Sequence, residues 1–155
     1  MRRRGIVAAM ALVGVAFAAQ GCGGPRESPA EVVRAASEAS RLGDVEELER
    51  RLDERMFGTL LRAGGGDREK LRQELISSAA QVMLKDYTVL RTTVEGDTAA
   101  VETEATFRLP GATEDVSVRG RTRLKKIEGE WRISGVEAMG GPGGAGGPRG
   151  RRGRT

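Results

Sequence analysis

The spacing of apolar residues changes once along this chain, and the change lies near Tyr87. Before it, apolar residues recur at helical intervals, as in Leu48, Leu52 and Met56. After it, apolar and polar residues alternate, as in residues 101–108. A run of helices followed by a run of strands predicts an α+β fold, in which helices cover one face of an antiparallel sheet.

Capping signals predict three helices before the change of period. Ser28-Pro29-Ala30-Glu31 has the form of a capping box with proline at the first helical position, and Gly43 is placed to end that helix. Asp44 begins a second helix, with an apolar stripe that continues to Leu61. Asp67 begins the third after the glycines of residues 64–66. Its expected buried side consists of Leu71, Leu75, Ala79, Val82 and Met83.

Alternation predicts four antiparallel strands, near residues 87–94, 101–108, 116–124 and 131–135. The sheet is expected to curve over the three helices. Leu90, Thr92 and Val94 are expected on one face of the first strand, and Tyr87 on the other.

A basic stripe on the third strand has two interpretations. It consists of Arg119, Arg121, Arg123 and Lys125. It could bind an anion or a lipid headgroup, or it could pair with Glu102 and Glu104 if Phe107 lies opposite Val116. We favour pairing, because the buried face fixes the register. Lys125 and Arg132 would face each other without an obvious acid, so they are the candidate anion contacts of the sheet.

Small residues recur among the positions expected to face inward: Thr103, Ala105, Gly120, Thr122 and Gly135. They could admit a helix closely or leave a mainly apolar pocket. Close packing is the favoured interpretation. Trp131 could cover such a pocket, although a tryptophan in the core is the more ordinary role.

The start of the chain has the pattern of an export signal: Arg2, Arg3 and Arg4, then an apolar run over residues 5–19. The following Ala19-Gln20-Gly21-Cys22 resembles the cleavage box of a bacterial lipoprotein. The resemblance implies removal of residues 1–21, lipidation of Cys22 and a linker over residues 22–27. It also implies anchoring in the cell membrane or outer membrane, facing the periplasm or exterior. The alternative is ordinary secretion after Ala16-Phe17-Ala18.

The end of the chain, residues 139–155, is rich in glycine and arginine and is expected to be disordered. Its arginines are candidate contacts to an anionic surface: Arg149, Arg151, Arg152 and Arg154. A tail that contacts nothing is the alternative.

Composition excludes several classes of site. The chain has no histidine and one cysteine, which excludes Ser-His-Asp and Cys-His arrangements and the usual zinc sites. Seven of its 26 basic residues lie in the two ends, leaving 19 against 22 acids in the body. No nucleic-acid partner is expected, because the body lacks a basic field. Neither a metal nor a cofactor is expected.

The order of these parts resembles the nuclear transport factor 2-like superfamily, and within it small bacterial lipoproteins. The segments that carry the resemblance are Ser28-Pro29-Ala30-Glu31-Val32-Val33, Gly43-Asp44, Gly96-Asp97-Thr98-Ala99-Ala100-Val101 and Lys125-Lys126-Ile127-Glu128-Gly129-Glu130-Trp131-Arg132-Ile133. The resemblance covers residues 28–138 and implies a curved sheet wrapped on helices, often with a cavity between them.

A related enzyme, ketosteroid isomerase, uses a carboxylate base within such a cavity. Glu102 and Glu104 are expected to point outward, which leaves only Glu137 near the inward set, so no catalytic residue is assigned. We therefore expect a lipid-anchored envelope domain that binds a small apolar ligand or an envelope protein without catalysis. The alternatives are a cofactor-free isomerase or lyase, and a tether that acts through the basic tail.

Overall fold

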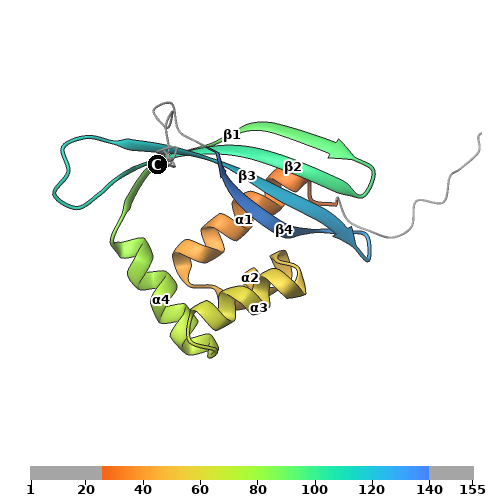
Figure 1. Ribbon diagram of the computed structural model, residues 1–155, viewed down its shortest axis with the longest axis horizontal. Helices are drawn as coiled ribbons and strands as arrows, with labels where there is room; N and C mark the ends of the chain where they lie inside the picture. Colours follow the sequence, from red (N-terminus) through yellow and green to blue (C-terminus); the bar gives the residue numbers. More distant parts are fainter. Residues whose placement is uncertain (1–25, 140–155) are drawn as a thin grey trace, which may run out of the picture.

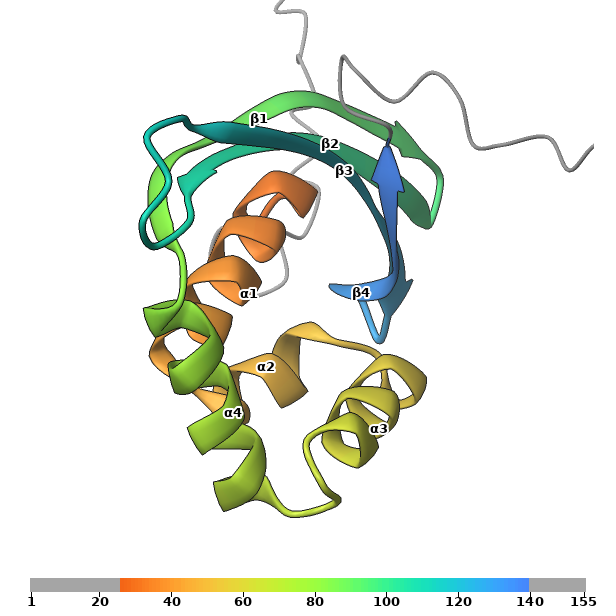
Figure 2. The same cartoon turned by 60° about the vertical axis from the view of Figure 1, so that its left-hand side comes forward.

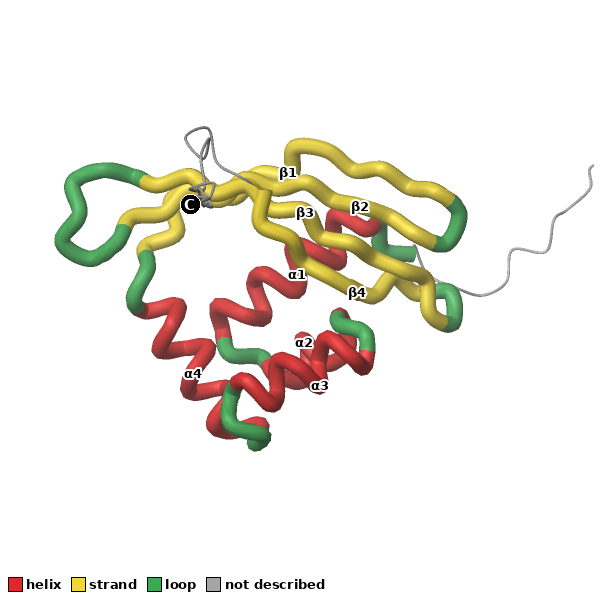
Figure 3. The backbone as a smooth tube through the Cα atoms, in the orientation of Figure 1, coloured by secondary structure: helices red, strands yellow, loops and turns green. Residues whose placement is uncertain are grey.

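The computed structural model describes residues 26–139, which form four helices followed by four strands. The helices are α1 (Pro29–Leu42), α2 (Val45–Arg51), α3 (Glu54–Ala63) and α4 (Arg68–Ala80). The strands are β1 (Met83–Glu95), β2 (Thr98–Arg108), β3 (Val116–Ile127) and β4 (Glu130–Met139), and they form one antiparallel sheet in sequential order. The predicted α+β fold is confirmed (Figure 3).

The sheet is curved, and the helices lie on its concave side (Figures 1 and 2). Helix α1 runs beneath the sheet and contacts β1, β2 and β4. Helices α2 and α3 contact β4, whereas α4 packs mainly on the other helices. Among the described residues, no helix has the length and apolarity needed to cross a bilayer.

The predicted caps of α1 are present. The Ser28 hydroxyl accepts a hydrogen bond from the Glu31 N–H, and the Glu31 carboxylate accepts one from the Ser28 N–H. Gly43 ends the helix in the left-handed conformation, with φ of 70°. Asp44 and Asp67 cap the helices that follow them, as expected.

The single second helix that the apolar stripe predicted is two helices, α2 and α3. The chain is extended at Leu52, which forms a parallel bridge with Ile133 of β4. The Asp53 N–H donates to the Ile133 carbonyl, and the Asp53 carboxylate accepts from the Met56 N–H to begin α3. The break is hidden in the sequence because Leu52 is buried and therefore fits the helical stripe.

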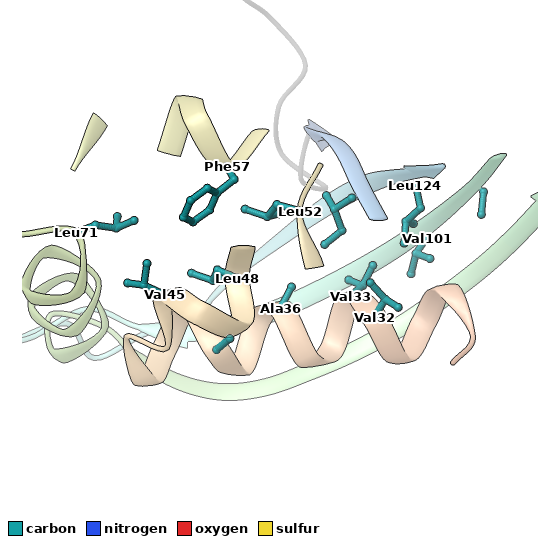
Figure 4. Close-up of a cluster of buried hydrophobic side chains, with 13 residues drawn as sticks. Val32, Val33, Ala36, Val45, Leu48, Leu52, Phe57, Leu71, Val101 and Leu124 are labelled. Atoms are coloured by element: carbon teal, nitrogen blue, oxygen red, sulfur yellow. The ribbon is translucent and has the colours of Figure 1, made fainter. Parts of the chain in front are cut away.

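The hydrophobic core joins α1 to the sheet and to the other helices (Figure 4). Helix α1 contributes Val32, Val33 and Ala36, and the sheet contributes Val101 and Leu124 among others. Helix α4 contributes Leu71, which is its one buried residue. The larger aromatic and aliphatic contributions come from the α2–α3 segment: Leu48, Leu52 and Phe57.

The register between β2 and β3 agrees with the prediction. Phe107 lies opposite Val116, and Glu102 lies opposite Arg121. Strand β1 departs from simple alternation, because its pairing with β2 shifts between Leu84 and Asp86 and again between Val89 and Arg91. These shifts place Tyr87 opposite Ala105 on the inner face, and the prediction that Tyr87 faces away is wrong. Strand β1 also begins at Met83, four residues earlier than expected.

A third shift corrects the predicted faces of β4. Between Arg123 and Leu124 the pairing skips Ser134, so Gly135 lies opposite Arg123 on the outer face. Glu137 lies opposite Arg121 and is also on the outer face. The expectation that Gly135 and Glu137 belong with the inward set is therefore wrong. Val136 takes the inner position, opposite Thr122.

Several sequence-based predictions lie outside the described residues. These are the signal over residues 1–21, lipidation of Cys22, most of the linker and the tail arginines.

Candidate functional site

A pocket of about 360 Å³ lies between α1, the end of α4, β1 and β2, and we call it the α1–α4 pocket. Its residues are Ser37, Ser40, Arg41, Ala79, Val82, Leu84, Tyr87, Ala105 and Phe107. Helix α1 supplies the polar wall, because Ser37, Ser40 and Arg41 follow at helical spacing. The other elements supply mainly apolar side chains. An apolar pocket with a few polar groups is the usual form of a small-molecule site.

Tyr87 is the titratable group of the apolar wall. Burial raises the pKa of its phenol, and the Thr103 hydroxyl and the Arg34 charge oppose that shift without reversing it. The phenol therefore stays protonated at neutral pH. In that state it is a hydrogen-bond donor on a residue that lines the pocket.

The candidate pocket residues from the sequence do not meet in one cavity. Ala105 lines the α1–α4 pocket, but Thr103 and Thr122 are only 9% and 6% exposed on the inner face, as close packing predicted. Gly120 is on the same face, and a Cβ there would lie 3.7 Å from Thr103 Oγ1, an ordinary contact. Gly135 is on the outer face, where an added Cβ would meet open space.

Trp131 lies at the other end of the molecule, partly buried against the core. The Lys126 ammonium lies 4.9 Å from the centroid of its ring. Trp131 lines a groove of about 750 Å³ with residues from the start of α1, from α2 and from the β3–β4 turn. Many of the groove's other side chains are charged and paired with each other, as Arg51 is with Glu27 and Glu47. This groove is thus a mixed-charge surface that the sequence did not predict.

Lys125 has an acidic partner that the sequence did not reveal. Its ammonium lies 2.8 Å from the Asp53 carboxylate, which is 5% exposed. Burial raises the pKa of Asp53, but the hydrogen bonds from Lys125 and from the Met56 N–H outweigh it, so the pKa is lowered. The expectation that Lys125 faces no acid is wrong, because the Leu52–Asp53 segment lies beside β4.

Arg132 lies opposite Lys125, as expected. Its guanidinium is 3.4 Å from the Glu49 carbonyl and 3.5 Å from the Glu130 carboxylate. Both candidate anion contacts of the sheet therefore have partners within the described residues.

The rest of the basic stripe is ion-paired. Arg119 Nε lies 2.6 Å from Glu104, and Arg121 Nε lies 3.9 Å from Glu102. Arg123 pairs with Glu137. The favoured interpretation of a solvated, paired face is confirmed for these residues. Exposed pairs of this kind contribute roughly 0–1 kcal/mol each.

Two parts of the site were missed from the sequence. The first is the contribution of Tyr87, hidden by the irregular pairing of β1. The second is the polar wall of α1, for which Ser37 and Ser40 beside the apolar face were the available signal. Among residues 26–139, no group of three or more acidic or cysteine side chains is placed to hold a metal ion.

No family model and none of the curated proteins matches the chain. Among solved structures, a SEC-C motif containing protein from Rhodopseudomonas palustris matches with a TM-score of 0.57. The two are 22% identical, over 73% of this chain and 80% of that one.

More distant matches include a protein from Campylobacter jejuni that is described as a nuclear transport factor 2-like transpeptidase. It is 16% identical over 70% of this chain and 98% of that one, with a TM-score of 0.48. A nuclear transport factor 2-like protein from Cytophaga hutchinsonii is 16% identical over 71% and 93%, with a TM-score of 0.45. The element order and the sheet curved over α1 are those that the sequence resemblance implied. Residues 26–139 therefore have the curved-sheet α+β fold that the sequence resemblance implied.

All three likenesses concern the fold alone. Whether the domain binds a ligand or catalyses a reaction depends on the side chains of the site and not on the fold.

Proposed function

We propose that this domain binds a small, mainly apolar ligand in the α1–α4 pocket without chemical turnover. The supporting observation is the pocket itself, about 360 Å³ with one polar and one apolar wall. Its volume lies within the range of about 300–1,000 Å³ that is usual for small-ligand sites. The protonated Tyr87 phenol supplies a donor that can orient the ligand.

The alternative, a cofactor-free isomerase or lyase, requires a carboxylate in an apolar cavity. The described lining of the α1–α4 pocket contains Arg41 and Tyr87 but no carboxylate. Glu102, Glu104 and Glu137 all lie on the outer face. This arrangement supports binding over catalysis, and turnover of small metabolites by the purified protein would overturn the proposal.

The proposed location is a bacterial envelope, with lipidated Cys22 as the anchor. It is supported by the sequence of residues 1–22. Mass spectrometry of the native protein tests it: we expect a chain that begins at Cys22 with added acyl mass. An unmodified thiol or a retained Met1 would refute it.

The basic tail is proposed as a secondary contact to an anionic surface through Arg149, Arg151, Arg152 and Arg154. Deleting residues 140–155 should weaken salt-sensitive association with vesicles that contain anionic lipid. Unchanged association would remove the tail from the proposal.

Ligand binding can be tested with N-phenyl-1-naphthylamine, a neutral fluorophore that brightens in apolar surroundings. We expect saturable binding to the full chain, and loss of that binding in Ala105→Trp and Ala79→Trp, which fill the pocket from β2 and from α4. Ala100→Trp is the matched control, because Ala100 lies opposite Arg123 on the outer face of β2. Binding that survives both pocket variants, or that only Ala100→Trp abolishes, would contradict the proposal.

A further inference from the structure

We propose that the α1–α4 pocket is specific for a singly charged anionic amphiphile, of the chemical class of a medium-chain carboxylate. Its charged end would lie at Arg41, and its chain would lie against β1 and β2. This inference rests on the proposed function and adds the chemistry of the ligand.

The two walls of the pocket differ in the way that such a ligand requires. Ser37, Ser40 and Arg41 all come from α1 and provide hydroxyls and a guanidinium. Facing them are side chains that can contact only an apolar chain: Ala79, Val82, Leu84, Ala105 and Phe107. A wholly apolar ligand would leave the polar wall without a partner, and a wholly polar ligand would lose its own hydration against the apolar wall without gaining hydrogen bonds there.

Arg41 is available at the rim of the pocket. Its guanidinium lies 2.9 Å from the Glu38 carboxylate, but the side chains of Arg41 and Glu38 are 50% and 57% exposed. Exposed i,i+3 pairs are weak, so the guanidinium can exchange Glu38 for a ligand carboxylate at small cost. Arginine is suited to this role because it can form two parallel hydrogen bonds to a carboxylate.

The charges around the pocket favour an anion over a cation. Arg41 is the one ionised side chain of the described lining, and the Arg34 charge is close enough to influence the Tyr87 phenol. The carbonyl end of α1 carries a partial negative charge nearby, and Arg41, in the last turn, offsets it. A cationic headgroup would meet the Arg41 guanidinium, and its partner Glu38, the nearest carboxylate, does not line the pocket.

The volume limits the length of the chain. At about 30 Å³ for each group the size of a water molecule, a pocket of 360 Å³ holds roughly 12 such groups. Decanoate, with ten carbons and two oxygens, matches that size. A long-chain lipid would extend out of the pocket.

The test is displacement of N-phenyl-1-naphthylamine from the full chain at neutral pH and below the micelle concentration of each competitor. The competitors are decanoate, 1-decanol and decyltrimethylammonium, which share a chain and differ in headgroup charge. For the native sequence we expect decanoate to bind about tenfold more tightly than decanol, as for a charge-assisted hydrogen bond. Decyltrimethylammonium should bind more weakly than either.

Arg41→Gln should reduce the preference for decanoate over decanol to less than about threefold, while the affinity for decanol stays unchanged. Arg41→Lys should restore part of the preference. Arg62→Gln is the matched control, because Arg62 lies on α3 and does not line the pocket.

Equal affinities for decanoate and decanol, tighter binding of the ammonium, or a preference that survives Arg41→Gln would overturn this inference and leave the pocket proposal standing. Failure of the fluorophore itself to bind would instead refute the proposed function.

Discussion

At the scale of single residues, Asp53 joins the helical layer to the sheet. Its N–H donates a hydrogen bond to the Ile133 carbonyl of the edge strand β4. Its carboxylate both caps α3 and pairs with Lys125 of β3. Three separate elements therefore depend on one buried acid. The same contacts shield one end of β4, an edge strand that would otherwise offer free backbone groups.

Asp53→Asn should destabilise the protein by about 1–2 kcal/mol at pH 7, because asparagine can still cap α3 but cannot pair with Lys125. Since the folded pKa of Asp53 is lowered, its extra stability exists above the ordinary aspartate pKa and disappears as the pH falls through the folded pKa. The stabilities of variant and native protein should therefore converge in acid. Urea unfolding at several pH values measures this.

Glu104→Gln is the control for that comparison, because it removes an exposed pair with Arg119. It should change the unfolding free energy by less than about 1 kcal/mol. An equal loss in the two variants would show that Asp53 is an ordinary surface acid.

Gly43→Ala should cost more than Gly96→Ala, although both glycines have positive φ. At Gly43 a Cβ would lie 2.8 Å from Ile76 Cγ1, whereas at Gly96 it meets open space. We expect about 1 kcal/mol for the left-handed backbone at Gly96, and at least 1 kcal/mol more at Gly43 from crowding against α4. Thermal unfolding of the two variants checks the order, and equal costs would contradict it.

At the scale of elements, the sequence predicts those whose local signals agree with their packing. The caps of α1 were identified because Ser28, Glu31 and Gly43 each have a local chemical role. The β2–β3 register on which the pairing hypothesis was based, with Phe107 opposite Val116, is the observed one, because both strands alternate regularly along their paired length. Periodicity is what sequence patterns detect, so regular segments are the ones they describe well.

The irregular elements could not be predicted in the same way. A bulge places two residues opposite one, and nothing in the composition around Leu90 or Ser134 marks the extra residue. Each bulge reverses the face of every later position, which is why Tyr87 and Gly135 were misplaced. The α2–α3 break was missed for a different reason, since Leu52 is buried in a bridge to β4 rather than in a helix.

The helices cover the inner face of the sheet unevenly, and a matched pair of valines tests this. Val101 is fully buried beneath the helices, whereas Val116, on the same face of the neighbouring strand, is 43% exposed. Val101→Ala should cost about 2 kcal/mol and Val116→Ala less than about 0.5 kcal/mol. Denaturant unfolding measures both, and similar costs would mean that the inner face is uniformly covered.

At the scale of the whole molecule, the two faces of the sheet have different roles. The outer face is charged and internally paired, with Arg119, Arg121 and Arg123 each in an ion pair with an acid. The inner face holds the core at one end (Figure 4) and the α1–α4 pocket at the other. Binding is therefore expected within the concave side rather than on the outer surface of the sheet.

The central claim is that a small apolar ligand binds in the α1–α4 pocket, and methyl NMR of the full chain during titration with N-phenyl-1-naphthylamine tests it directly. We predict that the largest shift changes occur at the methyl groups of Val82, Leu84 and Ala105, and that those of Val136 on β4 change little. Changes centred on Val136 or near Trp131, or none at saturating probe, would contradict the account.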